Sequence, residues 1–159
     1  MIKVDHKDVI LRTFILFVQT AHAVLKYADA HLYKETGLST IKFIVLRILA
    51  SNGGTMTPSE IANWTHRERH NITTLIERME KSELVRTKRN DKDKRFINIT
   101  ITDKGHKFLS TASPVARKII SQVMSLISEG DAIVLEKQLQ GMRENAHNSF
   151  ELVAKRSVI

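Results

Sequence analysis

A run of basic side chains near the middle of the chain has the chemistry of a polyanion-binding segment. From Arg86 to Arg95, six residues are Lys or Arg and two are Asp, so the segment has a net charge of +4. Ammonium and guanidinium groups donate charge-assisted hydrogen bonds to phosphate oxygens, and an Arg suits a narrow minor groove, where negative potential is focused. The run therefore indicates contact with nucleic acid, and the alternative is an ordinary solvated turn.

The net charge of the whole chain supports this interpretation only weakly. The 159 residues include 25 Lys and Arg against 17 Asp and Glu, a formal net charge of +8. Residues 1–50, 51–105 and 106–159 carry +3, +3 and +2, so the excess is spread along the chain. A basic chain favours polyanionic partners in general, but only the local concentration identifies a place for them.

Other site chemistries are poorly supported. His66 and His70 flank Glu68, but in the zinc-protease motif the Glu directly follows the first His, and Arg67 and Arg69 would repel a cation. The chain has no cysteine, which excludes thiolate metal sites, cysteine nucleophiles and thiol redox control. We therefore expect no cofactor, no metal site and no enzymatic activity; an enzyme that uses the His66–His70 pair is kept as a rival.

Helix-start signals precede the basic run. Thr57 and Glu60 form the pattern of a capping box, with Pro58 at the first helical position. A short helix should follow, and then a second from about Arg67 to Ser82 with apolar residues at helical spacing. Thr65 and Glu68 also fit a capping box, which leaves the start of the second helix open by a few residues. The pair indicates a helix-turn-helix.

The period of the pattern then changes to that of strands. Residues 84–89 and 96–101 predict two strands joined by the polar loop 90–95, with Ile97, Ile99 and Ile101 on one face. This hairpin would form the wing of a winged helix-turn-helix.

Long amphipathic segments flank this middle region. A helix from about His6 to Thr36, stopped by Gly37, is too long for one small core to cover, which suggests a partner helix from a second chain. Ser39 should cap a second helix ending at Asn52, and Thr102 another, which Pro114 should kink or break. A last helix should run from about 129–131 to 153.

No targeting or membrane segment is expected. The N-terminus lacks the pattern of a secretory signal. The most apolar windows, Val9–Val18 and Ile41–Ala50, fall short of the ~20 apolar residues that span a bilayer. We expect a soluble, cytoplasmic protein without a membrane partner.

The middle region resembles the MarR family of transcriptional regulators. The resemblance rests on residues 57–62 at the start of the helix-turn-helix, residues 72–80 in its second helix, Leu84-Val85, Asp93-Lys94-Arg95, and residues 99–105. His66 and Glu83 stand where Gly is common in the family, and residues 67–70, at the start of the second helix, are unusually charged.

The resemblance implies a mainly α fold of α+β winged-helix type. Residues 1–159 would form a single unit, with a DNA-binding lobe at 38–105 and dimerisation helices at 1–37 and 106–159. It also implies a homodimer that represses transcription at palindromic double-stranded DNA and that a small-molecule effector can release.

The resemblance also suggests which residues contact DNA. Recognition-helix residues should meet the major groove, and wing residues the backbone and the minor groove. Asp93 would orient Arg95 rather than contact DNA. The expected recognition-helix residues are Arg67, Arg69, His70, Thr73, Thr74 and Arg78, and the wing residues are Arg86, Lys88, Lys92, Asp93, Lys94 and Arg95. The alternative function is a winged-helix module for protein–protein contact that has lost DNA binding.

Overall fold

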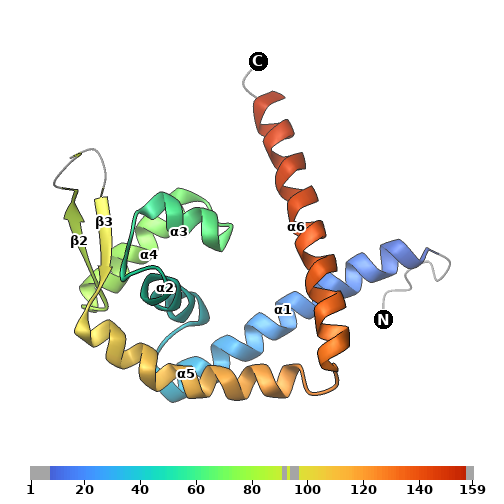
Figure 1. Ribbon diagram of the computed structural model, residues 1–159, viewed down its shortest axis with the longest axis horizontal. Coiled ribbons are helices and arrows are strands. Elements are labelled where there is room, and N and C mark those ends of the chain that lie inside the picture. The colour runs from blue at the N-terminus through green and yellow to red at the C-terminus, as the bar shows by residue number, and fades with distance from the viewer. Residues whose placement is uncertain (1–7, 91–92, 94–96, 157–159) are drawn as a thin grey trace. The chain divides into compact units, whose positions relative to one another are not determined.

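The computed structural model describes residues 8–90, 93 and 97–156, and side chains as far as residue 150. It is mainly helical with one small sheet, as expected (Figure 1). The elements, in order, are α1 (Val9–Thr36), α2 (Thr40–Ser51), β1 (Thr55–Met56), α3 (Pro58–Thr65), α4 (Arg69–Lys81), β2 (Val85–Arg89), β3 (Ile97–Ile101), α5 (Asp103–Val123) and α6 (Glu129–Arg156).

Contacts divide the chain into two compact units, Met1–Ile120 and Ser121–Ile159. The first contains the helix-turn-helix, the hairpin and most of α5. Its core is centred on α2, where Val45, Leu46, Ile48 and Leu49 are all buried. Four apolar residues within five positions give α2 an extensive apolar surface, and α1, β1 and β3 contact it.

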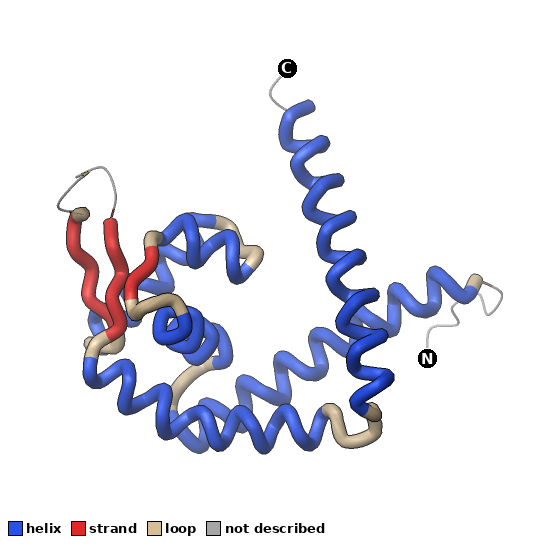
Figure 2. The backbone as a smooth tube through the Cα atoms, in the orientation of Figure 1, coloured by secondary structure: helices blue, strands red, loops and turns tan. Residues whose placement is uncertain are grey.

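The three strands lie side by side in the order β1-β3-β2 (Figure 2). Both pairings are antiparallel. β2 and β3 confirm the predicted hairpin. β1 was not predicted, because a strand of two residues is too short to show an alternating pattern. It pairs Thr55 with Thr100, and the hydroxyl oxygens of these residues lie 2.9 Å apart.

The capping box at the start of α3 is present as predicted. The Thr57 hydroxyl accepts from the Glu60 backbone N–H at 3.3 Å, and the Thr57 N–H donates to the Glu60 carboxylate at 2.7 Å. The bond from the Thr57 backbone N–H lowers the pKa of Glu60, and the bond from the Thr57 hydroxyl acts in the same direction. Ionised Glu60 therefore stabilises the folded state.

We expect Glu60→Gln to lower the free energy of unfolding at pH 7 by about 0.5 kcal/mol, because it removes the charge from this bond. A carboxyl whose pKa falls on folding adds stability above its unfolded pKa of 4.5 and loses it as the pH drops through the lower folded pKa. The difference in the free energy of unfolding between the variant and the native chain should therefore become smaller at acid pH. Urea unfolding at pH 7, 5 and 3.5 measures it, and a difference that widens in acid contradicts the assignment.

The junction between the sheet and α5 is held by Thr102. Its hydroxyl donates to the backbone oxygens of Glu83 (2.6 Å) and Leu84 (3.1 Å), and it accepts from the Gly105 N–H at 3.0 Å. Gly105 is buried directly against the Leu84 carbonyl. Thr102 and Gly105 thus form the joint that fastens α5 to the start of the wing.

The predicted break of α5 at Pro114 is absent, because the helix runs unbroken through the proline from Asp103 to Val123. Pro114 is exposed, so water can reach the carbonyl that its missing N–H leaves without a helical partner. Buried Ala112 and Ala116 hold the helix against the core on either side of the proline. Packing of α5 against the core therefore outweighs the local free-energy cost of a proline inside the helix.

The remaining helix boundaries agree with the sequence patterns, but Ser39 makes no side-chain cap bond at the N-cap of α2, so its predicted capping role is wrong. Asp8 caps α1 by accepting from the Leu11 N–H at 3.0 Å, and Gly37 ends that helix with a φ of 71°. In the second unit, Ser128 caps α6 by accepting from the Asp131 N–H at 3.1 Å. The predicted start and end of both terminal helices are thus correct to within a few residues.

The length argument against a membrane span does not hold for α1. An 18-residue window of this helix has a mean hydropathy of 1.4 and is not buried, so by length and composition alone it could cross a membrane. Core helices of soluble proteins pass the same test. The C-terminal part of α1 is tied to the first unit, since Leu32 is buried and the Asp29 carboxylate accepts from the Thr40 N–H of α2 at 2.6 Å.

Candidate nucleic-acid interface

The second helix of the helix-turn-helix, α4, has one buried face and one exposed face. Ile72, Ile76 and Met79 are buried, and Leu75 is half-buried. The opposite face is exposed and consists of polar and charged side chains: Arg69, His70, Thr73, Thr74, Glu77 and Arg78. The predicted recognition-helix residues from 69 onward therefore lie together on one open surface.

α4 begins at Arg69, two residues later than the predicted start. The alternative capping box at Thr65 is absent, because the Thr65 hydroxyl donates to the Ile61 carbonyl at 2.7 Å and Glu68 makes no side-chain cap bond. Arg67 lies in the turn, exposed, with its N–H bonded to the Ala62 carbonyl at 3.1 Å. The exposed Arg69 thus stands at a helix N-terminus, where the helix dipole also favours an anion.

The two threonines of this face donate within the helix. The Thr73 hydroxyl donates to the Arg69 carbonyl at 3.1 Å, and the Thr74 hydroxyl donates to the His70 carbonyl at 3.2 Å. With their protons engaged, these exposed side chains offer an acceptor oxygen and a methyl group. A methyl group packs against the thymine methyl, so thymine contact fits this geometry better than donation to a phosphate.

His66 and Glu83, which stand where Gly is common in the family, both have a left-handed backbone conformation. His66, in the turn between α3 and α4, has a φ of 49°, and Glu83, after α4, has a φ of 59°. Glycine adopts this conformation without steric cost, which explains why it is common at both positions. The backbone of the helix-turn-helix is therefore preserved in spite of the two substitutions.

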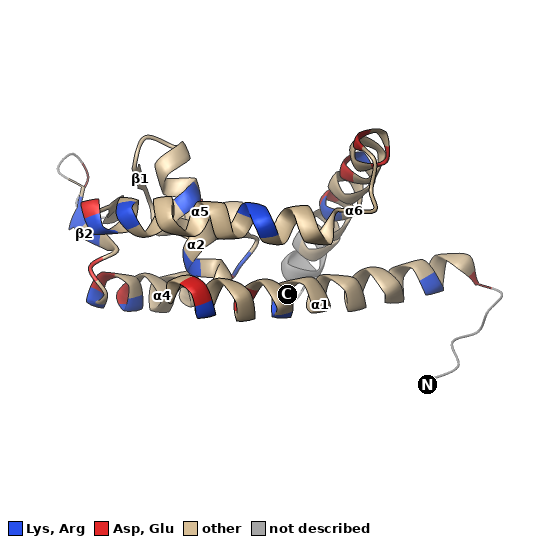
Figure 3. Cartoon of the chain, turned by 90° about the horizontal axis from the view of Figure 1, so that it is seen from below, with Lys and Arg blue, Asp and Glu red and all other residues tan. Residues whose placement is uncertain are grey.

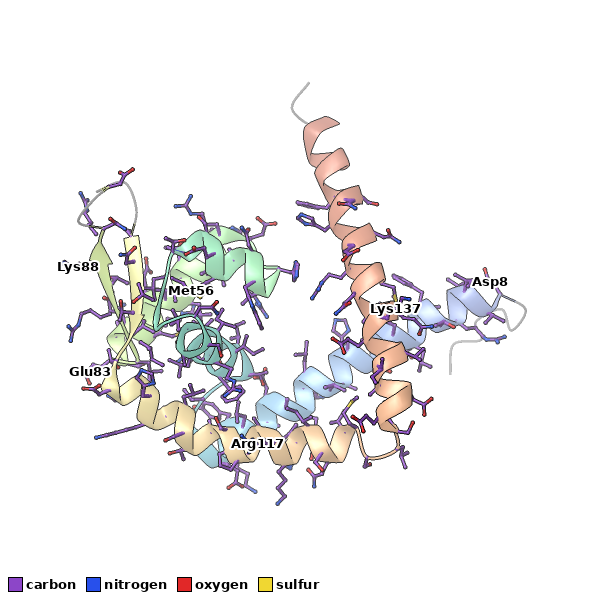
Figure 4. All side chains as sticks on the ribbon, in the orientation of Figure 1. Asp8, Met56, Glu83, Lys88, Arg117 and Lys137 are labelled. Atoms are coloured by element: carbon purple, nitrogen blue, oxygen red, sulfur yellow. The ribbon has the colours of Figure 1, made fainter. Side chains whose placement is uncertain are left out.

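The wing presents basic side chains along β2. Arg86, Lys88 and Arg89 are exposed, and Arg86 and Lys88 lie opposite Thr100 and Asn98 of β3. Figure 4 shows Glu83 at the base of the hairpin and Lys88 nearer its tip. The first basic residues of the predicted run, Arg86, Lys88 and Arg89, thus lie on the strand β2.

The tip of the wing is only partly described. The Asp93 N–H donates to the Asn90 side-chain oxygen at 3.2 Å, and the Asn90 amide donates to the Asn98 side-chain oxygen at 3.4 Å. Lys92, Lys94 and Arg95 lie outside the described residues, so their contacts and the predicted role of Asp93 as a partner of Arg95 stay predictions.

A shallow depression lies at the base of the wing. Its lining includes the cations Arg86, Lys88 and Lys104 together with Glu83 and Asp103. Lys104 forms an exposed ion pair with Glu83 at 2.8 Å, and its hydrogen bond, followed by its charge, lowers the pKa of the Glu83 carboxyl. The two acidic groups offset much of the positive charge here.

The charges of the described residues are unevenly placed within the first unit. Figure 3 shows Lys and Arg along β2 and on α4, while long stretches of α1 carry neither sign. Among the described residues no group of three or more His, Asp or Glu side chains is placed to hold a metal ion. The exposed basic groups on α4 and β2 thus remain the surface with the clearest binding chemistry.

Sequence reasoning missed one residue of this region, Glu80. Its carboxylate accepts from both the backbone N–H and the hydroxyl of Thr87 on β2, each at 2.7 Å. In the sequence, Glu80 looks like any polar residue near the end of a helix. Only the fold brings it to the strand seven residues later.

Comparisons with known proteins agree with this architecture. The MarR family model matches residues 36–95. The transcriptional repressor MprA of Escherichia coli is 28% identical over 105 residues, which cover 65% of this chain and 60% of the repressor. The match thus spans less than two thirds of that relative.

Two solved structures show the same fold. The MarR family regulator Sco3205 of Streptomyces coelicolor, solved in complex with DNA, has a TM-score of 0.81 at 19% identity over 91% of this chain and 90% of its own. The organohalide-sensing regulator RdhR, solved with 2,4-dichlorophenol, has a TM-score of 0.78 at 23% identity over 91% and 89%. The residues of the helix-turn-helix and the wing, together with these matches, show that the chain is similar to MarR family regulators, and the family model matches residues 36–95 of it.

Proposed function

We propose that this chain is a sequence-specific, double-stranded-DNA-binding transcriptional repressor. The observation that carries the proposal is the open polar face of α4, which begins with Arg69 at a helix N-terminus and lies in the same compact unit as a basic wing. The similarity to the repressor MprA supports regulation, and the DNA complex of Sco3205 supports this fold as a DNA-binding one.

In this proposal α4 enters the major groove. Arg69 can donate two hydrogen bonds to guanine O6 and N7, while Thr73 and Thr74 present methyl groups to thymine. His70, Arg78 and Arg67 flank these contacts. Arg86 and Lys88 bind phosphates, and the wing tip with Lys92, Lys94 and Arg95 reaches the minor groove.

We further propose that the chain acts as a homodimer in the cytoplasm. Large apolar side chains of α1 are exposed, including Ile10 at 80% and Phe14 at 56%. In the second unit, Ile133 and Phe150 of α6 are exposed to 63% and 59%. Exposed apolar surface of this extent favours burial against another protein chain. A second copy would supply it, and would place two winged lobes on half-sites about one helical turn apart.

Phe14→Asp should therefore produce a monomer at micromolar concentration, because it places a charge on the apolar stripe of α1. Gln19→Asp, on the opposite side of the same helix, adds the same charge and should leave the dimer intact. Light scattering coupled to size-exclusion chromatography gives the mass of each. A native chain that is monomeric, or two variants with equal mass, contradicts the dimer.

A small-molecule effector is the proposed release signal. The RdhR structure holds 2,4-dichlorophenol, and this chain has no cysteine with which to sense oxidants. A bound ligand is therefore the more suitable switch. The test is thermal stability and DNA affinity in the presence of small aromatic acids and phenols.

Selection of bound genomic fragments by the purified protein tests the proposed function. Recovery of a palindromic fragment, with its own upstream region among the candidates, supports the repressor. Recovery of no fragment at low salt overturns it and favours the protein–protein module.

A further inference from the structure

The Glu80 carboxylate connects the two elements that are proposed to contact DNA. It lies in the last turn of α4 and accepts both the backbone N–H and the hydroxyl of Thr87, at 2.7 Å each. Thr87 is the middle residue of β2. Both residues are half-buried, so water competes less for these bonds than it would at an open surface.

The position of β2 explains why such a bond is available. In the order β1-β3-β2, the strand β2 lies at the edge of the sheet, and within the described part of the chain it pairs with β3 alone. N–H groups on the outer side of an edge strand have no strand partner. The Thr87 N–H finds the Glu80 carboxylate instead, and hydrogen bonds to an ionised acceptor are stronger than those between neutral groups.

We propose that Glu80 is a positioning residue, whose two bonds to Thr87 hold the wing at a fixed orientation to the recognition helix. This inference rests on the proposed function. A wing held in place contacts DNA as an intramolecular step once α4 has docked, at a high effective concentration. A loosened wing must be ordered at the moment of binding, and part of its contribution to affinity is lost.

A purely structural role for Glu80 makes a different prediction. If the bonds only satisfied an edge N–H, their loss would lower stability without changing what the wing contributes to DNA affinity. The quantity that separates the two roles is therefore the affinity lost on removing wing cations, measured with and without Glu80.

The experiment measures DNA affinity of the full chain by fluorescence anisotropy on a selected palindromic duplex. In the native background, Arg86→Ala with Lys88→Ala should weaken binding about tenfold, because two phosphate contacts per lobe are lost. In the Glu80→Ala background, the same pair should weaken it about twofold or less. Glu80→Gln, whose amide oxygen can still accept, should recover much of the native difference.

Glu35→Ala is the matched control, because it removes the same charge from an exposed position on α1 without touching Thr87. In that background as well, Arg86→Ala with Lys88→Ala should lower the DNA affinity about tenfold. An equal cost in the Glu80→Ala and native backgrounds overturns the positioning role. Should Glu80→Ala fail to fold, Thr87→Val removes the hydroxyl bond alone and must reduce the wing contribution in the same direction.

The proposed function and this inference fail in different ways. A native chain that binds no duplex overturns both. A native chain that binds, with a wing contribution independent of Glu80, overturns only the positioning role.

Discussion

Replacing Gly105 with Ala is expected to lower the free energy of unfolding by about 3 kcal/mol or more. A Cβ at this position would collide with the Leu84 carbonyl oxygen and come within 2.8 Å of the Ile101 side chain and 3.3 Å of Leu46. The carbonyl belongs to the backbone and also accepts from the Thr102 hydroxyl, so it cannot move aside without breaking the joint. Chemical unfolding monitored by circular dichroism measures the effect.

Gly141→Ala provides the control for that prediction. Gly141 lies within α6, and nothing comes within 4 Å of a Cβ built there. Alanine in a helix interior is favoured over glycine by about 1 kcal/mol, so this variant should gain stability. Equal stabilities for the two variants would mean that α5 is not fastened tightly to the start of β2.

Arg69→Ala should weaken binding to the native operator by about 10- to 100-fold and relax the preference at the base that Arg69 contacts. The side chain is exposed at the first position of α4, on the same exposed face as Thr73 and Thr74. Loss of a bidentate contact to guanine removes discrimination as well as affinity. Binding to duplexes that vary one base pair at a time measures both effects.

Arg117→Ala is the matched control, since it removes the same group from an exposed position on α5. It should leave the base preference unchanged. If Arg69→Ala preserves the full preference while lowering affinity, Arg69 is a phosphate contact and the base reading lies elsewhere on α4.

Local signals in the sequence were enough to predict most elements of the fold. Thr57 and Glu60, three residues apart, form the two hydrogen bonds of the capping box. The alternating positions of Ile97, Ile99 and Ile101 place them on one face of a strand. The burial of Ile99 and Ile101 confirms that face, while Ile97 at its end is 45% exposed. Such features depend on near neighbours, so the sequence alone contains them.

Features that depend on distant residues could not be predicted. The continuity of α5 through Pro114 comes from packing against the core, and the role of Glu80 depends on where β2 lies. The exposed face of α4 was predicted from helical spacing, because only the buried stripe had to be recognised. Which of its side chains read bases depends on the DNA, and this stays a prediction.

The salt dependence of affinity for a selected palindrome and for a scrambled duplex of equal composition tests the central claim most directly. The account predicts that log K for the palindrome falls linearly with log salt, with a slope of about −4 or steeper, because phosphate contacts release counterions. At each salt concentration the palindrome should bind at least about 100-fold more tightly than the scrambled duplex. A slope near zero, or equal affinity for the two duplexes, would contradict sequence-specific DNA binding by this chain.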